Sequence, residues 1–248
     1  MALATLLALT LGLGGVAQRP PSVSPASIAV SQASPRPAAL TLARLLNSEA
    51  MIIGGTDSTD KARQIMGDLA AANADMKAME AQHPGFTRAM ADAMTPIALR
   101  SMRERLPELW RRQALVYGKR FNDAELETLN AFYASPTGQK IIDRMQQAMG
   151  HKAMVAEAAA SPDFKFSAKS VQQDKDEAAR TMVKALDASD MTVLAMLQKT
   201  GLVDRIKAMA PETEGNALQW YDEQAPWEEA ETEKAMAAVM TRFGVSGE

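Results

Sequence analysis

The stretch that decides the fold is residues 121–149, which read FNDAELETLNAFYASPTGQKIIDRMQQAM. Asn122 and Glu125 have the spacing of a capping box, in which each side chain binds the backbone N–H of the other residue at the start of a helix. Apolar residues then recur at helical spacing as far as Ser135, which can cap a second helix with Pro136 at its first position. The stretch therefore predicts an αα-hairpin, made of a helix, a tight corner and a second helix.

Gly138 lies in the first turn of the predicted second helix. Because glycine has no Cβ, a neighbouring backbone can come close to it there. We expect the apolar residues of both helices to form one stripe that faces the core: Leu126, Leu129, Phe132, Tyr133, Ile141, Ile142, Met145 and Met149.

The block at residues 121–140 resembles the signature of an exported bacterial family catalogued as domain of unknown function 2059. Members of that family typically carry Phe-Thr, an acidic-Leu pair, and then Phe-Tyr-x-Ser-Pro-x-Gly before a basic residue. The positions that fit this pattern are Phe121, Glu125, Leu126, Phe132, Tyr133, Ser135, Pro136 and Gly138. Asn122 replaces the usual Thr, and Gln139 stands before the basic Lys140. The resemblance implies a helical fold and an export signal, and it implies no particular activity.

A second, degenerate copy of the hairpin is predicted farther along the chain. When the sequence is aligned with itself at an offset of 65 residues, six positions of the first copy match residues of similar character in the second. The pairs are Phe121/Leu186, Asn122/Asp187, Glu125/Asp190, Leu126/Met191, Leu129/Leu194 and Phe132/Leu197. Past the corner the offset becomes 61, and residues 141–145 fall on 202–206. We therefore expect two degenerate copies that pack together through their apolar faces.

Composition favours the same fold class. The 248 residues include 46 Ala against 19 Val plus Ile, and aromatic residues make up 5%. Alanine is the best helix former, whereas β-branched and aromatic residues favour strands. We expect an all-α, multi-helix protein built on αα-hairpins.

The chain divides into four predicted segments. Residues 1–17 hold an apolar run followed by small residues, which is typical of a secretory signal peptide cleaved after about Ala17. Residues 18–38 are rich in Pro and Ser and are expected to form a disordered tether. A helical region with the signature hairpin follows at 39–160, and a second helical region, the degenerate repeat, at 174–244. The mature protein is expected to be periplasmic or secreted, with no stable transmembrane anchor.

Prolines predict an interruption between residues 86 and 118. Pro96 and Pro107 each lack a backbone donor, and proline inside a helix kinks or breaks it. We expect kinked or consecutive short helices in this region, with Pro107 at the first position of one of them.

The sequence contains no motif that is typical of an enzyme. His83 and His151 form no HxH or HExxH motif, and neither a Gly-x-Ser-x-Gly elbow nor a Walker A loop is present. Zero cysteines exclude disulfides, thiol catalysis and thiolate metal sites. We therefore predict no catalytic, cofactor-binding or metal-binding residue and no cofactor. A hydrolase-like envelope enzyme whose carboxylates converge only in the fold remains an alternative.

Methionine is unusually frequent, with 17 residues. Several pairs are spaced to share a helix face: Met76/Met79, Met90/Met94, Met145/Met149 and Met236/Met240. Methionine fills irregular gaps, so these faces can form a deformable core or an adaptable apolar groove. A further alternative is a soft-metal site for copper through Met149, His151 and Met154.

Charge is segregated along the chain. The net charge of −3 gives no reason to expect nucleic-acid binding. Residues 212–233 hold eight acidic residues and no basic one, whereas basic residues crowd an earlier segment around Trp110 and Tyr117: Arg100, Arg103, Arg105, Arg111, Arg112, Lys119 and Arg120. We expect this basic strip to be a helix face neutralised by Glu104, Glu108 and the acidic segment. A surface for anionic lipid headgroups or a partner is the alternative.

The sequence thus favours a non-enzymatic interaction or binding module of the cell envelope. Its expected partner is an envelope protein or an apolar ligand.

Overall fold

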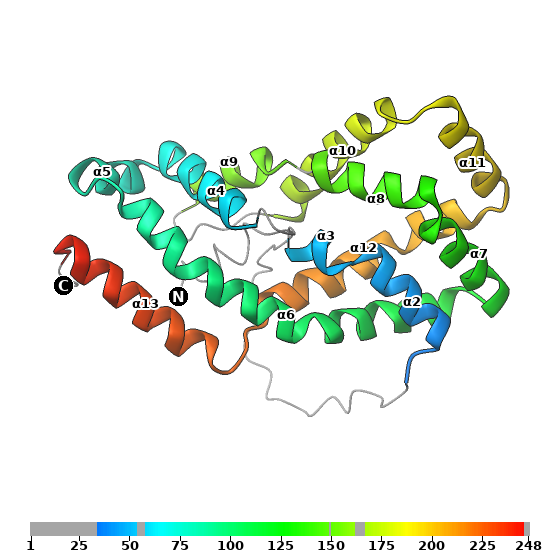
Figure 1. Ribbon diagram of the computed structural model, residues 1–248, viewed down its shortest axis with the longest axis horizontal. Coiled ribbons are helices and arrows are strands. Elements are labelled where there is room, and N and C mark those ends of the chain that lie inside the picture. The colour runs from blue at the N-terminus through cyan, green and yellow to red at the C-terminus, as the bar shows by residue number, and fades with distance from the viewer. Residues whose placement is uncertain (1–33, 54–57, 149, 162–166, 246–248) are drawn as a thin grey trace.

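The computed structural model describes residues 34–53, 58–148, 150–161 and 167–245. The predicted signal peptide and most of the predicted tether lie outside these ranges. Every regular element within them is a helix, which confirms the all-α prediction. In chain order the helices are α2 (Pro37–Leu46), α3 (Glu49–Ile53), α4 (Ser58–Ala72), α5 (Ala74–Gln82), α6 (Phe86–Arg120), α7 (Asp123–Ala134), α8 (Pro136–Ala148), α9 (Lys152–Ala160), α10 (Ala168–Lys184), α11 (Ala188–Lys199), α12 (Leu202–Asp222) and α13 (Glu228–Phe243) (Figure 1).

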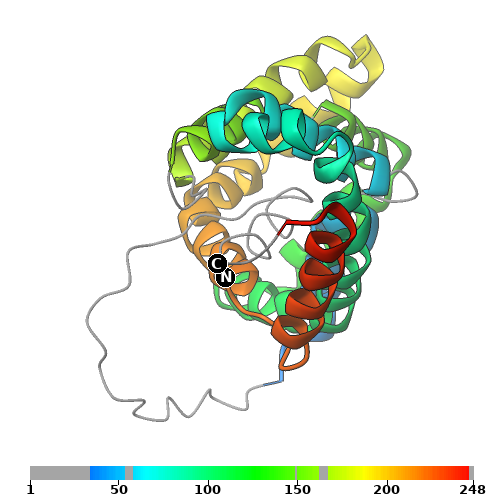
Figure 2. The same ribbon diagram turned by 90° about the vertical axis from the view of Figure 1, so that its left-hand side faces the viewer.

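Helix α6 is the central helix of the described fold. Helices α2, α3, α4, α5, α12 and α13 all pack against it. Helices α7 and α11 lie at one end of the molecule, and α5 and the end of α13 lie at the other (Figure 1). Viewed along the long axis, the helices lie around the periphery (Figure 2). None of the helices described is both long enough and apolar enough to cross a membrane.

The core consists of three apolar clusters along α6. The first surrounds Met90 and Met94 and joins α4, α6, α9, α10 and α13. The second, around Leu106 and Trp220, joins α3, α6 and α12. The third, around Leu126, joins α2, α6, α7, α11 and α12. Since each cluster takes residues from before and after residue 174, the two predicted helical regions share their cores.

Of the two alternatives predicted for residues 86–118, consecutive short helices are wrong, and a kinked helix stays a prediction. Helix α6 runs for 35 residues with Pro96 and Pro107 inside it, so Pro107 is not the first residue of a helix. An interior proline costs a helix about 3 kcal/mol. Fully burying one large apolar side chain contributes about 1.5–3 kcal/mol, and this part of α6 buries several, among them Met102 and Leu106. Burial against other helices therefore outweighs the hydrogen bonds that the prolines lose.

Two helices begin earlier than the predicted boundaries. Helix α10 begins at Ala168 rather than at residue 174, and α2 begins at Pro37, where proline needs no N–H. The guanidinium of Arg36 fixes this start, since it pairs with Asp123 at 2.6 Å and donates to the carbonyl of Gly118 at 2.5 Å. Arg36 thereby ties α2 to the junction of α6 and α7.

The predicted hairpin is present as α7 and α8. The side chain of Asn122 accepts from the N–H of Glu125 at 3.0 Å, and the Glu125 carboxylate accepts from the N–H of Asn122 at 2.8 Å, so the capping box is confirmed. At the corner, the hydroxyl of Ser135 donates to the carbonyl of Phe132 at 2.6 Å and accepts from the N–H of Gly138 at 3.2 Å. The corner is thus closed by short-range polar contacts.

Gly138 allows two stretches of backbone to touch. A Cβ at this position would lie 2.1 Å from the carbonyl oxygen of Phe132 and 2.6 Å from the Cα of Tyr133. Real Cβ atoms essentially never come this close to backbone. The corner therefore requires glycine at residue 138, as its position in the first turn predicted.

Helices α11 and α12 repeat several of these details. Asp187 accepts from the N–H of Asp190 at 3.0 Å, and the Asp190 carboxylate accepts from the N–H of Asp187 at 3.2 Å, which is a second capping box. At the following corner, the hydroxyl of Thr200 donates to the carbonyl of Leu197 at 2.6 Å. A duplicated hairpin would have such matching contacts, and the duplication stays a prediction.

The two hairpins hold each other through these capping boxes. Lys140 of α8 binds the second box, with Asp187 at 2.9 Å and with Asp190. Arg205 of α12 in turn pairs with Glu125 of the first box. Each box therefore caps its own helix and also anchors the opposite hairpin, an arrangement that we call the reciprocal clamp.

We predict that Gly138→Ala lowers the free energy of unfolding by at least about 1–3 kcal/mol, because the new methyl group would collide with backbone. Gly67→Ala is the matched control, since Gly67 lies inside α4 with nothing within 4 Å of its missing Cβ. This control should gain up to about 1 kcal/mol from helix propensity. Urea denaturation followed by circular dichroism measures both effects, and equal midpoints for Gly138→Ala and the parent would show that the corner is not tight.

Candidate functional site

A cleft of about 1080 Å³ opens to solvent between α4, α8 and the start of α9. Ligand pockets typically have volumes of about 300–1,000 Å³, so this space can hold a small molecule. Its charged and titratable lining residues are Asp60, Lys61, Asp68, Asp143, His151 and Lys152.

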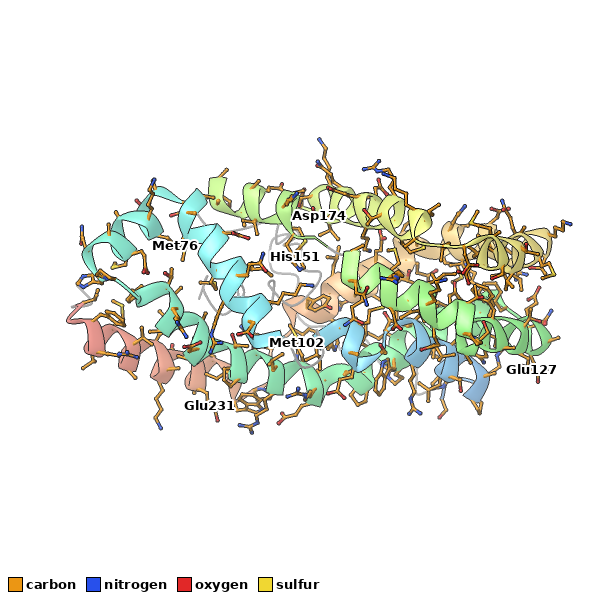
Figure 3. The ribbon with its side chains drawn as sticks, turned by 45° about the horizontal axis from the view of Figure 1, so that its top comes forward. Met76, Met102, Glu127, His151, Asp174 and Glu231 are labelled. Atoms are coloured by element: carbon orange, nitrogen blue, oxygen red, sulfur yellow. The ribbon has the colours of Figure 1, made fainter. Side chains whose placement is uncertain are left out.

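The start of α9 is held by a carboxylate from another helix. Asp174 of α10 is 3% exposed and accepts from the N–H groups of Ala153 at 3.0 Å and Met154 at 3.1 Å. These are N–H groups that no carbonyl inside the helix can bind. His151 precedes α9 without capping it through its side chain, and it lies next to Asp174 near the middle of the molecule (Figure 3). The His151 ring is therefore free to line the cleft.

The imidazole of His151 is half-buried and neutral. Both ring nitrogens are shielded from solvent, and neither has a hydrogen-bond partner among the described residues. Burial, and to a smaller extent the positive charge of Lys61, lowers the pKa of His151 to about 4, while Asp174 opposes the shift. A neutral imidazole carries one N–H donor and one lone pair, so the ring would offer a ligand both a donor and an acceptor once the side chains that shield its nitrogens moved aside.

The other charged groups of the lining differ in how readily a ligand can bind them. Burial lowers the pKa of the Lys61 ammonium, which brings it closer to its neutral form. The Asp60 carboxylate is exposed and pairs with Arg63 at 2.6 Å. The cleft thus combines an unpaired imidazole and a half-buried amine with carboxylates along an open rim, which suits the binding of a polar ligand.

Of the predicted soft-metal residues, the structure describes His151 and Met154. Met154 belongs to the first apolar cluster and is 5% exposed, and Met149 lies outside the described residues. In the described ranges, no three His, Cys, Asp or Glu side chains form a group that could hold a metal ion. Of the two described residues, His151 lines the cleft and Met154 does not.

Most of the described methionines lie in the core rather than along a groove. Those that are buried are Met66, Met90, Met94, Met102, Met154 and Met209. Others are partly buried and pack on the first apolar cluster: Met76, Met79, Met236 and Met240. This distribution agrees with the interpretation of these faces as a deformable core.

The basic strip of α6 is neutralised as predicted. Arg112 pairs with Glu108 at 2.9 Å and with Glu223 of the acidic segment at 2.8 Å. Arg111 also pairs with Glu108, and this contact is the main reason that the pKa of the Glu108 carboxyl falls to about 2. Further ion pairs tie the strip to neighbouring helices: Arg100–Glu231, Arg103–Glu49 and Arg120–Glu212. The arginines therefore hold helices together rather than form a free basic surface.

Sequence reasoning missed the grouping of Lys61, His151 and Asp174. These residues come from α4, the start of α9 and α10, so no spacing along the chain relates them. His151 alone had a signal, because it follows Gly150 at a break between two helices.

The lowered pKa of His151 predicts a dependence of stability on pH. The unfolded chain binds a proton at His151 with a pKa near 6.5, whereas the folded chain binds it near 4. The contribution is therefore fully present above about pH 6.5 and falls, by up to about 3 kcal/mol, as the pH drops to about 4. His151→Phe should remove this part of the profile in urea denaturation at several pH values, and a variant that follows the parent over this interval would contradict the prediction.

Comparison with known proteins gave no match among curated proteins and none among solved structures. A family model matches residues 107–162. This segment covers the end of α6 and all of α7, α8 and α9, so it contains the signature hairpin and the His151 side of the cleft. The α4 side lies outside it. Over residues 107–162 the chain is therefore similar to the family described as an uncharacterized protein conserved in bacteria (DUF2059), which is the family that the sequence resembles.

Proposed function

We propose that this protein is an exported, non-enzymatic binding module of the cell envelope, and that its ligand occupies the cleft lined by His151. The observation that carries the proposal is the half-buried, neutral imidazole in the cleft wall, whose two shielded nitrogens have no hydrogen-bond partner among the described residues. A buried polar group without a partner costs about 1–3 kcal/mol. A ligand that pairs with both nitrogens would recover much of this cost, which favours the bound state.

The expected ligand is small and polar and carries both a hydrogen-bond donor and an acceptor. Asp60, Asp68 and Asp143 together with Lys61 and Lys152 make the lining mixed in charge, which disfavours a strongly anionic ligand. An apolar ligand, the sequence-based expectation, fits less well because the methionines that suggested it lie mostly in the core.

A hydrolase-like enzyme is the alternative function. A neutral imidazole can act as a general base, and perturbed pKa values such as those of His151 and Lys61 cluster at catalytic sites. The same cleft would then hold a substrate, and conversion of that molecule would separate the two functions.

Native mass spectrometry of protein purified from its own envelope tests the ligand site. We expect a bound small molecule that is retained by the parent and lost from His151→Leu. His83→Gln is the matched control, since His83 ends α5 away from the cleft lining and should keep the ligand. Retention by His151→Leu would place the ligand elsewhere, chemical conversion of the ligand would favour the enzyme, and copper that resists dialysis would favour the soft-metal alternative.

Export has a separate test. If residues 1–17 are a cleaved signal peptide, the mature protein in the periplasmic or secreted fraction begins near Gln18. Intact-mass measurement of the fractionated protein should give this truncated form. A cytoplasmic protein that keeps Met1 would contradict export and leave the ligand site unaffected.

A further inference from the structure

The outer face of α11 is apolar and uncovered. Met191 is 46% exposed and Met196 is 56% exposed. With the exposed Ala188, Thr192 and Ala195 they follow the i, i+3, i+4, i+7, i+8 spacing of one helix face. The opposite face packs on the third apolar cluster through Val193, Leu194 and Leu197. Helix α11 therefore presents apolar side chains on two faces, of which the protein buries one.

Helix α2 covers two positions of the corresponding face of α7, whereas Ala131, which corresponds to Met196, is exposed. With the offset of 65 residues, Met191 corresponds to Leu126, which is 0% exposed. Ala195 corresponds to Asn130, whose side-chain amide donates to the carbonyl of Ala38 in α2 at 2.9 Å. The two hairpins thus differ at the positions of Leu126 and Asn130: α2 lies on them in α7, and no described helix lies on the matching positions of α11.

We propose that this face binds the same face of a second copy of the chain, with the two α11 helices antiparallel around a two-fold axis at the height of residue 193. In this arrangement Met191 of each copy lies opposite Ala195 of the other, so a long side chain meets a small one. Lys199, at the end of α11, lies opposite Asp187, at the start of α11 in the second copy. The Asp187 side chain is 59% exposed and can accept this second contact.

Charge and symmetry favour a second copy over an unrelated partner. The face has an acidic residue at its beginning, a basic residue at its end and uncharged residues between them. An antiparallel pair places each cation at the negative end of one helix dipole and near the anion of the other copy. Such a face is complementary to itself, and two-fold dimers are the commonest protein oligomers.

The size of the face predicts a reversible dimer. A helix of 12 residues is about 18 Å long. Its contact area is smaller than the roughly 800 Å² per partner of a standard stable interface. We therefore expect monomers and dimers to exchange with concentration.

Sedimentation equilibrium of the full mature chain tests the dimer. The parent should shift from monomer to dimer as its concentration rises to about millimolar. Ala195→Glu should weaken the dimer at least about tenfold, because it places a desolvated carboxylate in the contact. Ala131→Glu is the matched control, since Ala131 is exposed in α7 outside the proposed contact, and it should dimerise like the parent. Equal melting temperatures would show that both variants fold.

Disulfide crosslinking locates the contact, because the natural chain has no cysteine. Thr192→Cys lies beside the proposed axis and should give a covalent dimer under oxidised glutathione. Thr128→Cys is its control on α7: both threonines are exposed, and each hydroxyl donates to the carbonyl four residues earlier at 2.9 Å. A chain that stays monomeric at every concentration would overturn the proposal. So would a dimer that Ala195→Glu leaves intact and Thr192→Cys fails to crosslink.

Discussion

Helix α6 enters all three apolar clusters, and its arginines must be neutralised wherever α12 and α13 close over it. Arg105 is held in another way, through hydrogen bonds with Trp220 and the face of the indole ring. The Trp220 indole N–H donates to the carbonyl of Arg105 at 2.9 Å, and the Arg105 guanidinium donates back to the carbonyl of Trp220 at 2.5 Å and lies 4.8 Å from the indole ring centroid. Nearby, the carboxylate of Glu228, which is 2% exposed, accepts from the hydroxyl of Ser101 and from the N–H of Ala225. The basic residues of α6 and the acidic segment therefore help to attach α12 and α13 to α6.

The sequence predicts the parts of the fold that short-range contacts determine. The capping box of Asn122 and Glu125, the corner hydroxyl of Ser135 and the close approach at Gly138 all involve residues a few positions apart. The course of α6 could not be predicted in this way. Pro107 has an unfavourable local effect, and the burial that offsets it comes from α3 and α12, which are distant in sequence. The cleft is even harder to predict from the sequence, because its walls come from three helices, α4, α8 and α9. Its histidine also depends on Asp174 of α10, which holds the start of α9.

In the reciprocal clamp, one sequence motif, the capping box, stabilises both the start of a helix and the contact between the two hairpins. A capping box satisfies N–H groups that a helix leaves unpaired at its start. In this protein the acidic residues of both boxes also bind a cation from the opposite hairpin, and the contact of Glu125 with Arg205 lowers the pKa of the Glu125 carboxyl. Folding of each helix start and docking of the two hairpins therefore depend on the same carboxylates.

The methionines also differ in how easily an oxidant can reach their thioether sulfur atoms. Sulfur atoms in the clusters, such as those of Met90 and Met102, lie in side chains that are at most 1% exposed. Met191 and Met196 are about half exposed on α11. Oxidation turns an apolar thioether into a polar sulfoxide, and exposed sulfur atoms react before buried ones. Mild oxidative damage would therefore alter the outer surface of α11 before it reached the interior, so the protein could lose the apolar character of that surface while it stayed folded.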